Sequence, residues 1–419
     1  MPEGVVIVGS GQAGYQTAAS LRTEGYEGPV FLIGEEPGAP YQRPPLSKAF
    51  VLGKQNHTQI LLRPEAFYRD HRIELLTGGK AVAIDRAARK VRLDSGGELG
   101  GRGLSGRELS YDTLVLALGA RNRPLPVAGA TLEGVCYLRT LAEAIEVKQR
   151  LEQAQQVVIV GGGFIGLEIA ASARTLGKPV TVIEALPRLM ARVVAPVVSE
   201  FFLASHTARG VEVLLNAKVQ EIEGDVHGAD RGKVQGVLLH DGRRLPADMV
   251  VIGVGIVPNT ELAMESGLPI ANGIVASEFL RTPDERVFAI GDCAEHPSVF
   301  ASAQVRLESV QNAVDQAVCV ARAITGKAAP YSATPWFWSD QFDIRLQMAG
   351  LPGGHDHTVI RGAPESGKFS VFYFRDGKLC AVDSVNRPAD HLAARRLIGS
   401  GTALTPGQAA DESVNLRTV

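Results

Sequence analysis

Two copies of one glycine-rich segment, 152 residues apart, constrain this chain more than any other feature of its sequence. The first copy starts at Val5 and reads VVIVGSGQAGYQTAASLRTEG, and the second starts at Val157 and reads VVIVGGGFIGLEIAASARTLG. Each copy combines an apolar run, three glycines spaced G-x-G-x-x-G and a helical pattern, and each leads to a further apolar run, at residues 30–33 or 180–183. This order predicts strand, tight turn, helix and parallel strand, which is the dinucleotide-binding unit.

The three glycines of such a unit have separate roles. The first permits the tight turn, the second lets the backbone approach a pyrophosphate, and the third lets the helix pack against the sheet. They are Gly9, Gly11 and Gly14 in the first copy and Gly161, Gly163 and Gly166 in the second. Two structural turns without a ligand are the alternative. Because both copies lie in the full strand–turn–helix context, we expect two dinucleotide sites.

An acidic residue after the second strand of the unit binds the ribose hydroxyls. Glu184 holds this position in the second copy and has no Arg as its immediate neighbour, which favours NAD over NADP, although Arg188 is close enough to leave the choice open. In the first copy Gly34 holds the position, and the acid follows one residue later as Glu35, with Glu36 as a possible substitute. The alternative is that both are solvated loop acids.

Composition excludes several other classes of protein. The chain has 419 residues, of which 45% are hydrophobic, so we expect a large core in two or three domains. A net charge of −2 argues against a nucleic-acid partner. No long apolar run predicts a membrane span, and an apolar strand begins almost at the N-terminus, so we expect a cytoplasmic protein. The four cysteines are widely spaced and read as reduced thiols: Cys136, Cys293, Cys319 and Cys380.

Five further segments carry a resemblance to a known family. They are residues 40–48 (PYQRPPLSK), 116–121 (LALGAR), 288–293 (FAIGDC), 308–313 (ESVQNA) and 335–341 (PWFWSDQ). Together with the two fingerprints, they resemble the bacterial FAD-dependent NADH:ferredoxin reductases typified by putidaredoxin reductase. That family belongs to the glutathione reductase-like pyridine nucleotide-disulfide oxidoreductases. The resemblance covers essentially the whole chain, and its last segment is specific to the family.

The resemblance implies an α/β fold with two Rossmann-like domains and a C-terminal α+β domain. The FAD domain would comprise residues 1–120 and 249–328, the NAD domain residues 121–248, and the C-terminal domain residues 329–419. In the last of these, Asp376-Gly377 separates two strand patterns, at residues 368–374 and 378–385, and predicts a hairpin. The Gly-rich stretch at residues 96–107 reads as a mobile hairpin tip.

The resemblance also implies site residues. Lys48 would lie beside the flavin, Glu168 where the nicotinamide amide docks, and Trp338 would shield the flavin; these three are the catalytic candidates. The FAD candidates are Gly9, Gly11, Ala13, Gly14, Glu35, Arg43, Lys48, Ala81, Arg121, Arg139, Asp292, Val310 and Trp338. The NAD candidates are Gly161, Gly163, Phe164, Ile165, Gly166, Glu168, Glu184 and Gly255.

Each of these roles has a simpler structural alternative. Lys48 would then be a surface lysine, Glu168 an acid that stabilises the start of a helix, and Asp292 the cap of a turn. Trp338 would be a core residue. We expect no metal site: the pair His355 and His357 reads as a surface turn.

The expected function follows from the same resemblance. NADH would pass a hydride to FAD, which would send single electrons to a [2Fe-2S] ferredoxin that supplies a haem monooxygenase or a ring-hydroxylating dioxygenase. The absence of cysteines before Cys136 disfavours a disulfide or peroxide reductase. The alternatives are an NADH oxidase that reduces oxygen and a flavoprotein resembling apoptosis-inducing factor. We expect a monomer or weak dimer with no membrane partner, and Arg306 and Arg345 are candidates for docking an acidic ferredoxin.

Overall fold

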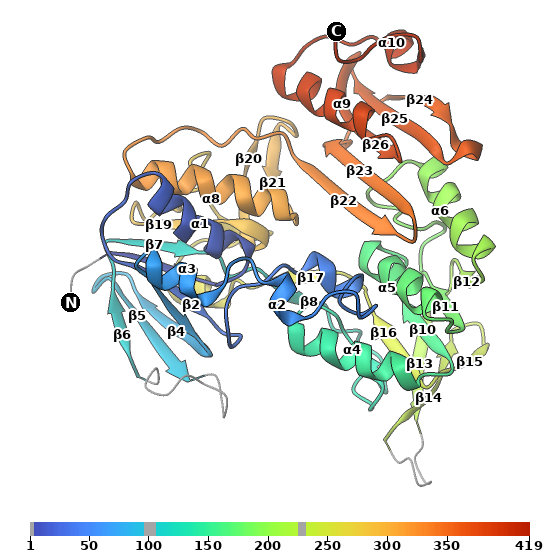
Figure 1. Cartoon of the computed structure of the whole chain (residues 1–419), viewed down its shortest axis with the longest axis horizontal. Coiled ribbons are helices and arrows are strands. Elements are labelled where there is room, and N and C mark those ends of the chain that lie inside the picture. Colours follow the sequence, from blue (N-terminus) through green and yellow to red (C-terminus); the bar gives the residue numbers. More distant parts are fainter. Residues whose placement is uncertain (1–3, 96–105, 225–231) are drawn as a thin grey trace. The chain divides into compact units, whose positions relative to one another are not determined.

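The computed structural model describes residues 4–95, 106–224 and 232–419, which form two compact units (Figure 1). Unit 1 comprises Met1–Gln42, Thr58–Arg121 and Val257–Pro335, and unit 2 comprises Arg43–His57, Asn122–Ile256 and Trp336–Val419. Most of the Gly-rich stretch predicted to be a hairpin tip, residues 96–105, lies outside the described residues. The domain boundaries drawn from the resemblance stay a prediction.

A five-stranded parallel sheet forms the centre of unit 1. In spatial order its strands are β19 (Val287–Ala289), β7 (Thr113–Leu116), β1 (Val5–Val8), β2 (Val30–Gly34) and β3 (Ile73–Thr77). Every residue of β1 and β2 is buried, as expected for Val- and Ile-rich parallel strands covered on both faces. The chain runs from β1 outward through β2 to β3 and then returns to place β7 on the other side of β1. The strand order therefore reverses between β1 and β7, and their carboxyl ends form the switch point where ligands bind in such sheets.

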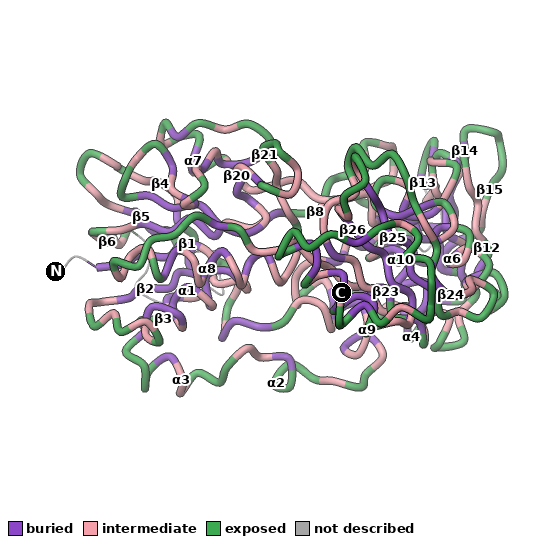
Figure 2. The backbone as a smooth tube through the Cα atoms, turned by 90° about the horizontal axis from the view of Figure 1, so that it is seen from above, coloured by how far each residue is buried: buried purple, intermediate pink, exposed green. Residues whose placement is uncertain are grey.

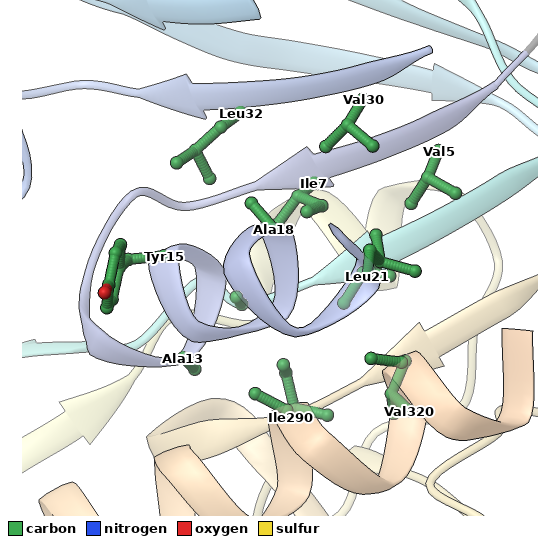
Figure 3. Close-up of a cluster of buried hydrophobic side chains, with 14 of the residues drawn as sticks. Val5, Ile7, Ala13, Tyr15, Ala18, Leu21, Val30, Leu32, Ile290 and Val320 are labelled. Carbon is green, nitrogen blue, oxygen red and sulfur yellow. The ribbon is translucent and has the colours of Figure 1, made fainter. Parts of the chain in front are cut away.

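Two helices, α1 (Gln12–Thr23) and α8 (Val310–Ile324), cover one face of this sheet. Figure 3 shows α1 between the strands and α8, with Ile7 of β1 on one side of Ala18 and Leu21, and Val320 of α8 on the other. All four side chains are fully buried. The helix ends where Gly25 adopts a φ of +89°, a backbone conformation that glycine adopts without strain.

The other face of the unit 1 sheet packs against a small antiparallel sheet, which holds Val91, Leu93 and Leu109 in a second core cluster. The small sheet consists of β4 (Gly79–Asp85), β5 (Lys90–Ser95) and β6 (Glu108–Ser110). The remaining elements of unit 1 are α3 (Glu65–Asp70), α7 (Glu261–Glu265), β18 (Ile274–Val275), η2 (Gly291–Cys293), β20 (Ala294–Ser298) and β21 (Ala303–Val305). Three short elements lie across the unit boundaries: α2 (His57–Ile60), β8 (Ala120–Asn122) and β17 (Ile256–Pro258).

Unit 2 repeats the parallel arrangement. Its central sheet has the order β12 (Val211–Leu214), β11 (Val180–Ile183), β10 (Val157–Val160), β16 (Met249–Ile252) and β9 (Val135–Cys136). Its helices are α4 (Leu141–Gln153), α5 (Phe164–Thr175) and α6 (Pro196–Ala208), and a short turn, η1 (Pro44–Ser47), packs against α4 and α5. An antiparallel sheet of β13 (Val219–Gly224), β14 (Val234–Leu239) and β15 (Arg244–Pro246) completes this part. Figure 2 shows how burial concentrates in the strands while the connecting loops are exposed.

The C-terminal part of unit 2 is a five-stranded antiparallel sheet with two helices. The strand order is β22 (Trp336–Gln341), β23 (Ile344–Gly350), β26 (Lys378–Val385), β25 (Lys368–Arg375) and β24 (His357–Ala363). The helical elements are η3 (Pro364–Ser366), α9 (Pro388–Ser400) and α10 (Pro406–Ala410). The predicted hairpin is β25–β26, with Asp376 and Gly377 both at positive φ. Both predicted strand–turn–helix–strand units and the α/β fold class are confirmed.

Candidate nucleotide-binding site and its acid–base cluster

The first glycine turn joins β1 to α1 at the carboxyl edge of the unit 1 sheet. Gly9 has a φ of +109°, and a Cβ there would lie 2.1 Å from the carbonyl oxygen of Ala117. A Cβ on Gly14 would lie 1.8 Å from the carbonyl oxygen of Gly9, so only glycine lets α1 approach this closely. Gly11 begins α1 without a side-chain cap, and a Cβ there would meet nothing within 4 Å. This cradle at a helix N-terminus fits a pyrophosphate.

The second glycine turn, between β10 and α5 in unit 2, has the same geometry. Gly161 has a φ of +113°, and a Cβ there would lie 2.4 Å from the carbonyl oxygen of Gly253. A Cβ on Gly166 would lie 2.1 Å from the carbonyl oxygen of Gly161. Gly163 again has no side-chain cap and open space where a Cβ would be. Phe164 and Ile165 form the first turn of α5.

The acid predicted after the second strand is in place in unit 2. The Glu184 carboxylate accepts hydrogen bonds from the backbone N–H of Gly162 at 2.7 Å and from that of Leu186 at 2.8 Å. These bonds fix the carboxylate beside the glycine turn, as a ribose-binding acid requires.

In unit 1 the position that corresponds to Glu184 is occupied differently. Gly34 replaces the acid, and a Cβ there would lie 2.1 Å from Oγ and 2.8 Å from Cβ of Ser10. Ser10 therefore fills the space that Glu184 uses in unit 2, where the residue equivalent to Ser10 is Gly162. Glu35 follows the strand with 66% of its side chain exposed, and its nearest described cation is Lys80, at 3.5 Å. Its predicted contact with FAD stays a prediction.

Asp292 lies beside the first glycine turn. It follows Gly291, whose φ is +73° and whose Cβ position would be 3.2 Å from Cβ of Ala13 in α1. The N–H of Gly291 donates to Oε1 of the buried Gln316 at 2.7 Å, and Arg306 donates to the Asp292 carbonyl oxygen at 3.0 Å. The apolar run from Val287 to Gly291 predicts a strand that reaches Asp292. In the structure, β19 ends at Ala289 and not at Gly291, because residues 291–293 turn.

Arg306 is a poor docking residue for a ferredoxin. Only 11% of its side chain is exposed, and it pairs with Glu308 at 2.6 Å in addition to supporting Asp292. Arg345 is 58% exposed and pairs with Asp340 at 2.8 Å. Of these two candidates, only Arg345 offers an accessible cation.

Helix α8 begins at Val310, one of the FAD candidates. Ser309 caps it by accepting a hydrogen bond from the N–H of Asn312 at 3.0 Å. Asn312 is itself buried and binds the carbonyl oxygen of Leu307 and the hydroxyl of Tyr331. The start of α8 is thus held by side chains from two loops.

Lys48 and Glu168 form an ion pair in unit 2, although 120 residues separate them. Lys48 Nζ lies 2.8 Å from Oε2 of Glu168, with 21% and 3% of the two side chains exposed. Ser47 donates to the same carboxylate oxygen at 2.5 Å, and its own carbonyl oxygen accepts from Ser172 of α5 at 2.7 Å. The short turn η1 therefore carries a lysine and a serine onto the buried face of α5, one turn beyond its glycine-rich start.

Strand β22 adds a third donor to this carboxylate. Ser339 donates to Oε1 of Glu168 at 2.7 Å across 171 residues of sequence. Because side chains alternate along a strand, Phe337 points the same way and meets Phe164 of α5 at 4.8 Å between ring centroids. Trp336 and Trp338 point the opposite way and lie 5.6 Å apart. The sequence motif singled out Trp338, whereas Ser339 and Ser47 were missed as ligands of Glu168.

Other predicted FAD residues have local partners. Arg43 donates to the carbonyl oxygen of Arg139, so these two candidates lie together in unit 2. Arg121, in unit 1, pairs with Glu261 at 2.6 Å and is 51% exposed. Ala81 is buried in β4, and Gly255 follows β16 with a φ of +106°. Their contacts with a dinucleotide remain predictions.

The four cysteines are unsuited to redox chemistry with one another. All are free, and Cys136 and Cys293 are buried. Burial raises the pKa of Cys136 and of Cys293 to about 12 and also raises the pKa of Cys319 and Cys380. A thiol at physiological pH is a poor nucleophile.

No helix in residues 4–95, 106–224 and 232–419 is long and apolar enough to cross a membrane. Within the same ranges, no three His, Cys, Asp or Glu side chains gather in an arrangement that could hold a metal ion.

Comparison with known proteins gives the family. Residues 3–317 match the model of the pyridine nucleotide-disulphide oxidoreductases, and residues 336–419 match the model of the reductase C-terminal domain. The chain belongs to this family of reductases. It is 48% identical to rhodocoxin reductase of Rhodococcus erythropolis over 99% of this chain and 93% of that protein. The resemblance inferred from the motifs is thus confirmed.

Two solved structures of such reductases are similar to it over the full length. The ferredoxin reductase for the CYP199A2 system of Rhodopseudomonas palustris has a TM-score of 0.94 and 46% identity, and each chain is 99% covered. Putidaredoxin reductase in its covalent complex with putidaredoxin has a TM-score of 0.93 and 41% identity, covering 99% of this chain and 97% of that one. Membership of this family implies FAD and NAD(P)H as cofactors.

Proposed function

We propose that this reductase takes electrons from NADH through FAD and passes them singly to a [2Fe-2S] ferredoxin. The observation that carries the proposal is the pair of uncapped glycine turns in a chain whose cysteines are isolated and held as thiols. Two dinucleotides have a place to bind, while no dithiol is present to accept electrons. The electrons therefore leave for an external acceptor, and relatives of this reductase are named for electron-carrier proteins.

The acid that lies beside each glycine turn indicates which cofactor the turn binds. We assign FAD to the turn at Gly9–Gly14, beside Asp292, and NADH to the turn at Gly161–Gly166, beside Glu184. Bound flavin would supply the conversion between two-electron and one-electron transfer. Lys48 and Glu168, held next to the second turn, would orient the nicotinamide end and keep the charge there balanced.

Preference for NADH over NADPH rests on Glu184 and Arg188. The carboxylate of Glu184 is held by two backbone N–H groups and would repel a 2′-phosphate. Arg188 cannot easily compensate, because its guanidinium donates to the carbonyl oxygens of Val194 and Ala191, both at 2.7 Å, and to the hydroxyl of Ser199 at 2.9 Å. Because its guanidinium already donates to these three acceptors, Arg188 is not placed to bind a 2′-phosphate.

Steady-state kinetics with both nucleotides tests this preference. We expect kcat/KM for NADH to exceed that for NADPH by on the order of a hundredfold, and Glu184→Gln to narrow the ratio by roughly tenfold, mainly by improving NADPH. The matched control is Glu212→Gln, in the neighbouring strand β12, which should leave the ratio unchanged. Equal use of both nucleotides by the unaltered protein would refute the role of Glu184.

The electron acceptor is tested by anaerobic reduction with NADH followed by mixing with a [2Fe-2S] ferredoxin. We expect bleaching of the flavin absorbance by NADH and rapid reduction of the ferredoxin, which would supply a haem monooxygenase or a ring-hydroxylating dioxygenase. Fast turnover with oxygen and none with any ferredoxin would favour an NADH oxidase instead. Slow turnover with both acceptors would favour a signalling flavoprotein.

Four unpaired thiols fit a cytoplasmic location. We also propose that the protein is a monomer or weak dimer, which size-exclusion chromatography would check.

A further inference from the structure

The Glu168 carboxylate divides its two oxygens between different partners. Oε2 accepts from Ser47 at 2.5 Å and from Lys48 at 2.8 Å, so this oxygen serves the ion pair. Oε1 accepts from Ser339 at 2.7 Å. With 3% of its side chain exposed, Glu168 has little access to water that could replace these donors. The orientation of the carboxylate therefore depends on Ser339.

Ser339 is the first member of a longer buried chain of hydrogen bonds. Its hydroxyl oxygen accepts from Nε2 of Gln341 at 3.2 Å, and Oε1 of Gln341 lies 2.9 Å from Nε2 of His206 in α6. All three residues are 0% exposed. The chain thus runs from helix α6 through two residues of strand β22 to Glu168 of helix α5.

Every hydrogen bond in this chain points toward Glu168. Since the Gln341 carbonyl oxygen can only accept, Nε2 of His206 must carry the hydrogen. Burial lowers the pKa of His206, so its ring is neutral and Nδ1, which has no described partner, carries no hydrogen. Gln341 then donates to Ser339, and Ser339 donates to the carboxylate. Aligned donors that end on a charged acceptor strengthen one another in a buried site.

We propose that His206, Gln341 and Ser339 are positioning residues that hold Oε1 of Glu168 so that Oε2 stays on Lys48. The roles of Lys48 and Glu168 in the hydride step rest on the proposed function, but the chain of hydrogen bonds does not. Ser339 and Gln341 belong to the family-specific segment at residues 335–341, so this proposal gives that segment a second role beside Trp338. His206 lies in no motif, and its part is visible only from its contact across 135 residues.

The first test compares Ser339→Ala with Ser384→Ala. Ser384 is a matched control because it is equally buried in the same sheet, but its hydroxyl bonds to Ser370 and not to Glu168. In flavin-loaded protein we expect Ser339→Ala to slow the limiting rate of flavin reduction by NADH on the order of tenfold, with little change in the apparent Kd for NADH. In Ser384→Ala the limiting rate and the apparent Kd should both stay within about twofold of the unaltered protein.

A second readout does not depend on turnover. Acetic anhydride labelling followed by mass spectrometry measures the reactivity of the Lys48 amine, which the ion pair protects. We expect several-fold faster labelling of Lys48 in Ser339→Ala and no change in Ser384→Ala. If NADH does not reduce the flavin at all, the proposed function fails while this labelling still tests the positioning chain. Equal labelling of Lys48 in the two variants and the unaltered protein would overturn the proposal.

His206 provides an independent pair of variants if Ser339→Ala proves unstable. His206→Leu removes the donor at the far end of the chain, whereas the amide of His206→Gln can still donate to Gln341. We expect faster labelling of Lys48 in His206→Leu and protection close to that of the unaltered protein in His206→Gln. Equal labelling in both would show that His206 only fills space, and the proposal would be wrong.

Discussion

At the scale of single residues, the two nucleotide turns differ by an exchange between neighbouring positions. Ser10 faces Gly34 in unit 1, and Gly162 faces Glu184 in unit 2. In each pair one residue is glycine, because the space beside the turn holds only one side chain. The acid of the first copy therefore falls one position later, at Glu35, and this shift could not be explained from the glycine pattern alone.

The exchange predicts a compensating pair of substitutions. Gly34→Ala places a Cβ 2.1 Å from Oγ and 2.8 Å from Cβ of Ser10, so we expect it to destabilise the protein by about 1–3 kcal/mol. Adding Ser10→Gly removes both of these close contacts and should restore most of the stability that Gly34→Ala loses. Urea unfolding of the single and double variants measures the coupling. A Gly34→Ala cost that is the same with and without Ser10 would contradict this account.

Asp383 is a buried acid whose protonation affects the stability of the fold. It is 2% exposed, accepts from the hydroxyl of Tyr373, and lies 3.3 Å from the backbone N–H of Ala195. Burial raises the pKa of Asp383 from 3.8 to about 7, although both hydrogen bonds act in the opposite direction. The folded chain therefore binds this proton more tightly than the unfolded chain does. The resulting stability is present below about pH 4 and is lost as the pH rises through 7.

Asp383→Asn should remove this pH dependence. The amide stays neutral, so we expect the variant to gain stability relative to the unaltered protein between about pH 5 and pH 8, by at most roughly 4 kcal/mol. Unfolding by urea across that range measures the difference. Asp356→Asn, an exposed acid in the same C-terminal domain, is the control and should show no such change. Parallel stability curves for Asp383→Asn and the unaltered protein would contradict the raised pKa.

At the scale of elements, local signals predicted local structure well. The units β1–α1–β2 and β10–α5–β11 and the β25–β26 hairpin follow from glycine spacing, apolar runs and one Asp-Gly turn, all within about thirty residues of sequence. The strand before Gly291 was predicted too long, because its apolar pattern continues to Ile290 while the backbone already turns toward Asp292.

The acid–base cluster could be predicted only in part. Lys48 and Glu168 came from a family resemblance, whereas Ser339, Gln341 and His206 did not, because their contacts join α5, β22 and α6 across more than a hundred residues. Alternation along β22 does place Ser339 and Gln341 on one face. No periodicity, however, states which element that face will meet.

At the scale of the whole molecule, the chain passes between the two units five times. The crossings follow residues 42, 57, 121, 256 and 335, so neither unit is a continuous segment. Each unit nevertheless contains one complete copy of the repeated glycine segment, with its own parallel sheet. Ligands that bind the two turns should therefore stabilise different sets of strands.

Hydrogen exchange can show which strands are stabilised by a ligand at each glycine turn. A ligand that binds only the folded state slows exchange in the elements it stabilises, and the unfolding free energy rises by about 2.7 kcal/mol at a hundred times its Kd. We expect removal of FAD to speed exchange in β1, α1 and β7 of unit 1. Addition of NAD⁺ to the flavin-loaded protein should slow exchange in β10, α5 and β16 of unit 2.

Gly163→Ala makes this prediction specific to the second turn. Its φ of −84° suits alanine, and a Cβ there meets nothing within 4 Å, so the fold should tolerate the change while the methyl group occupies the nucleotide cradle. We expect this variant to keep its flavin and lose the protection by NAD⁺. Protection of β1 and α1 by NAD⁺, or loss of flavin from Gly163→Ala, would mean that the two cofactors bind the opposite turns.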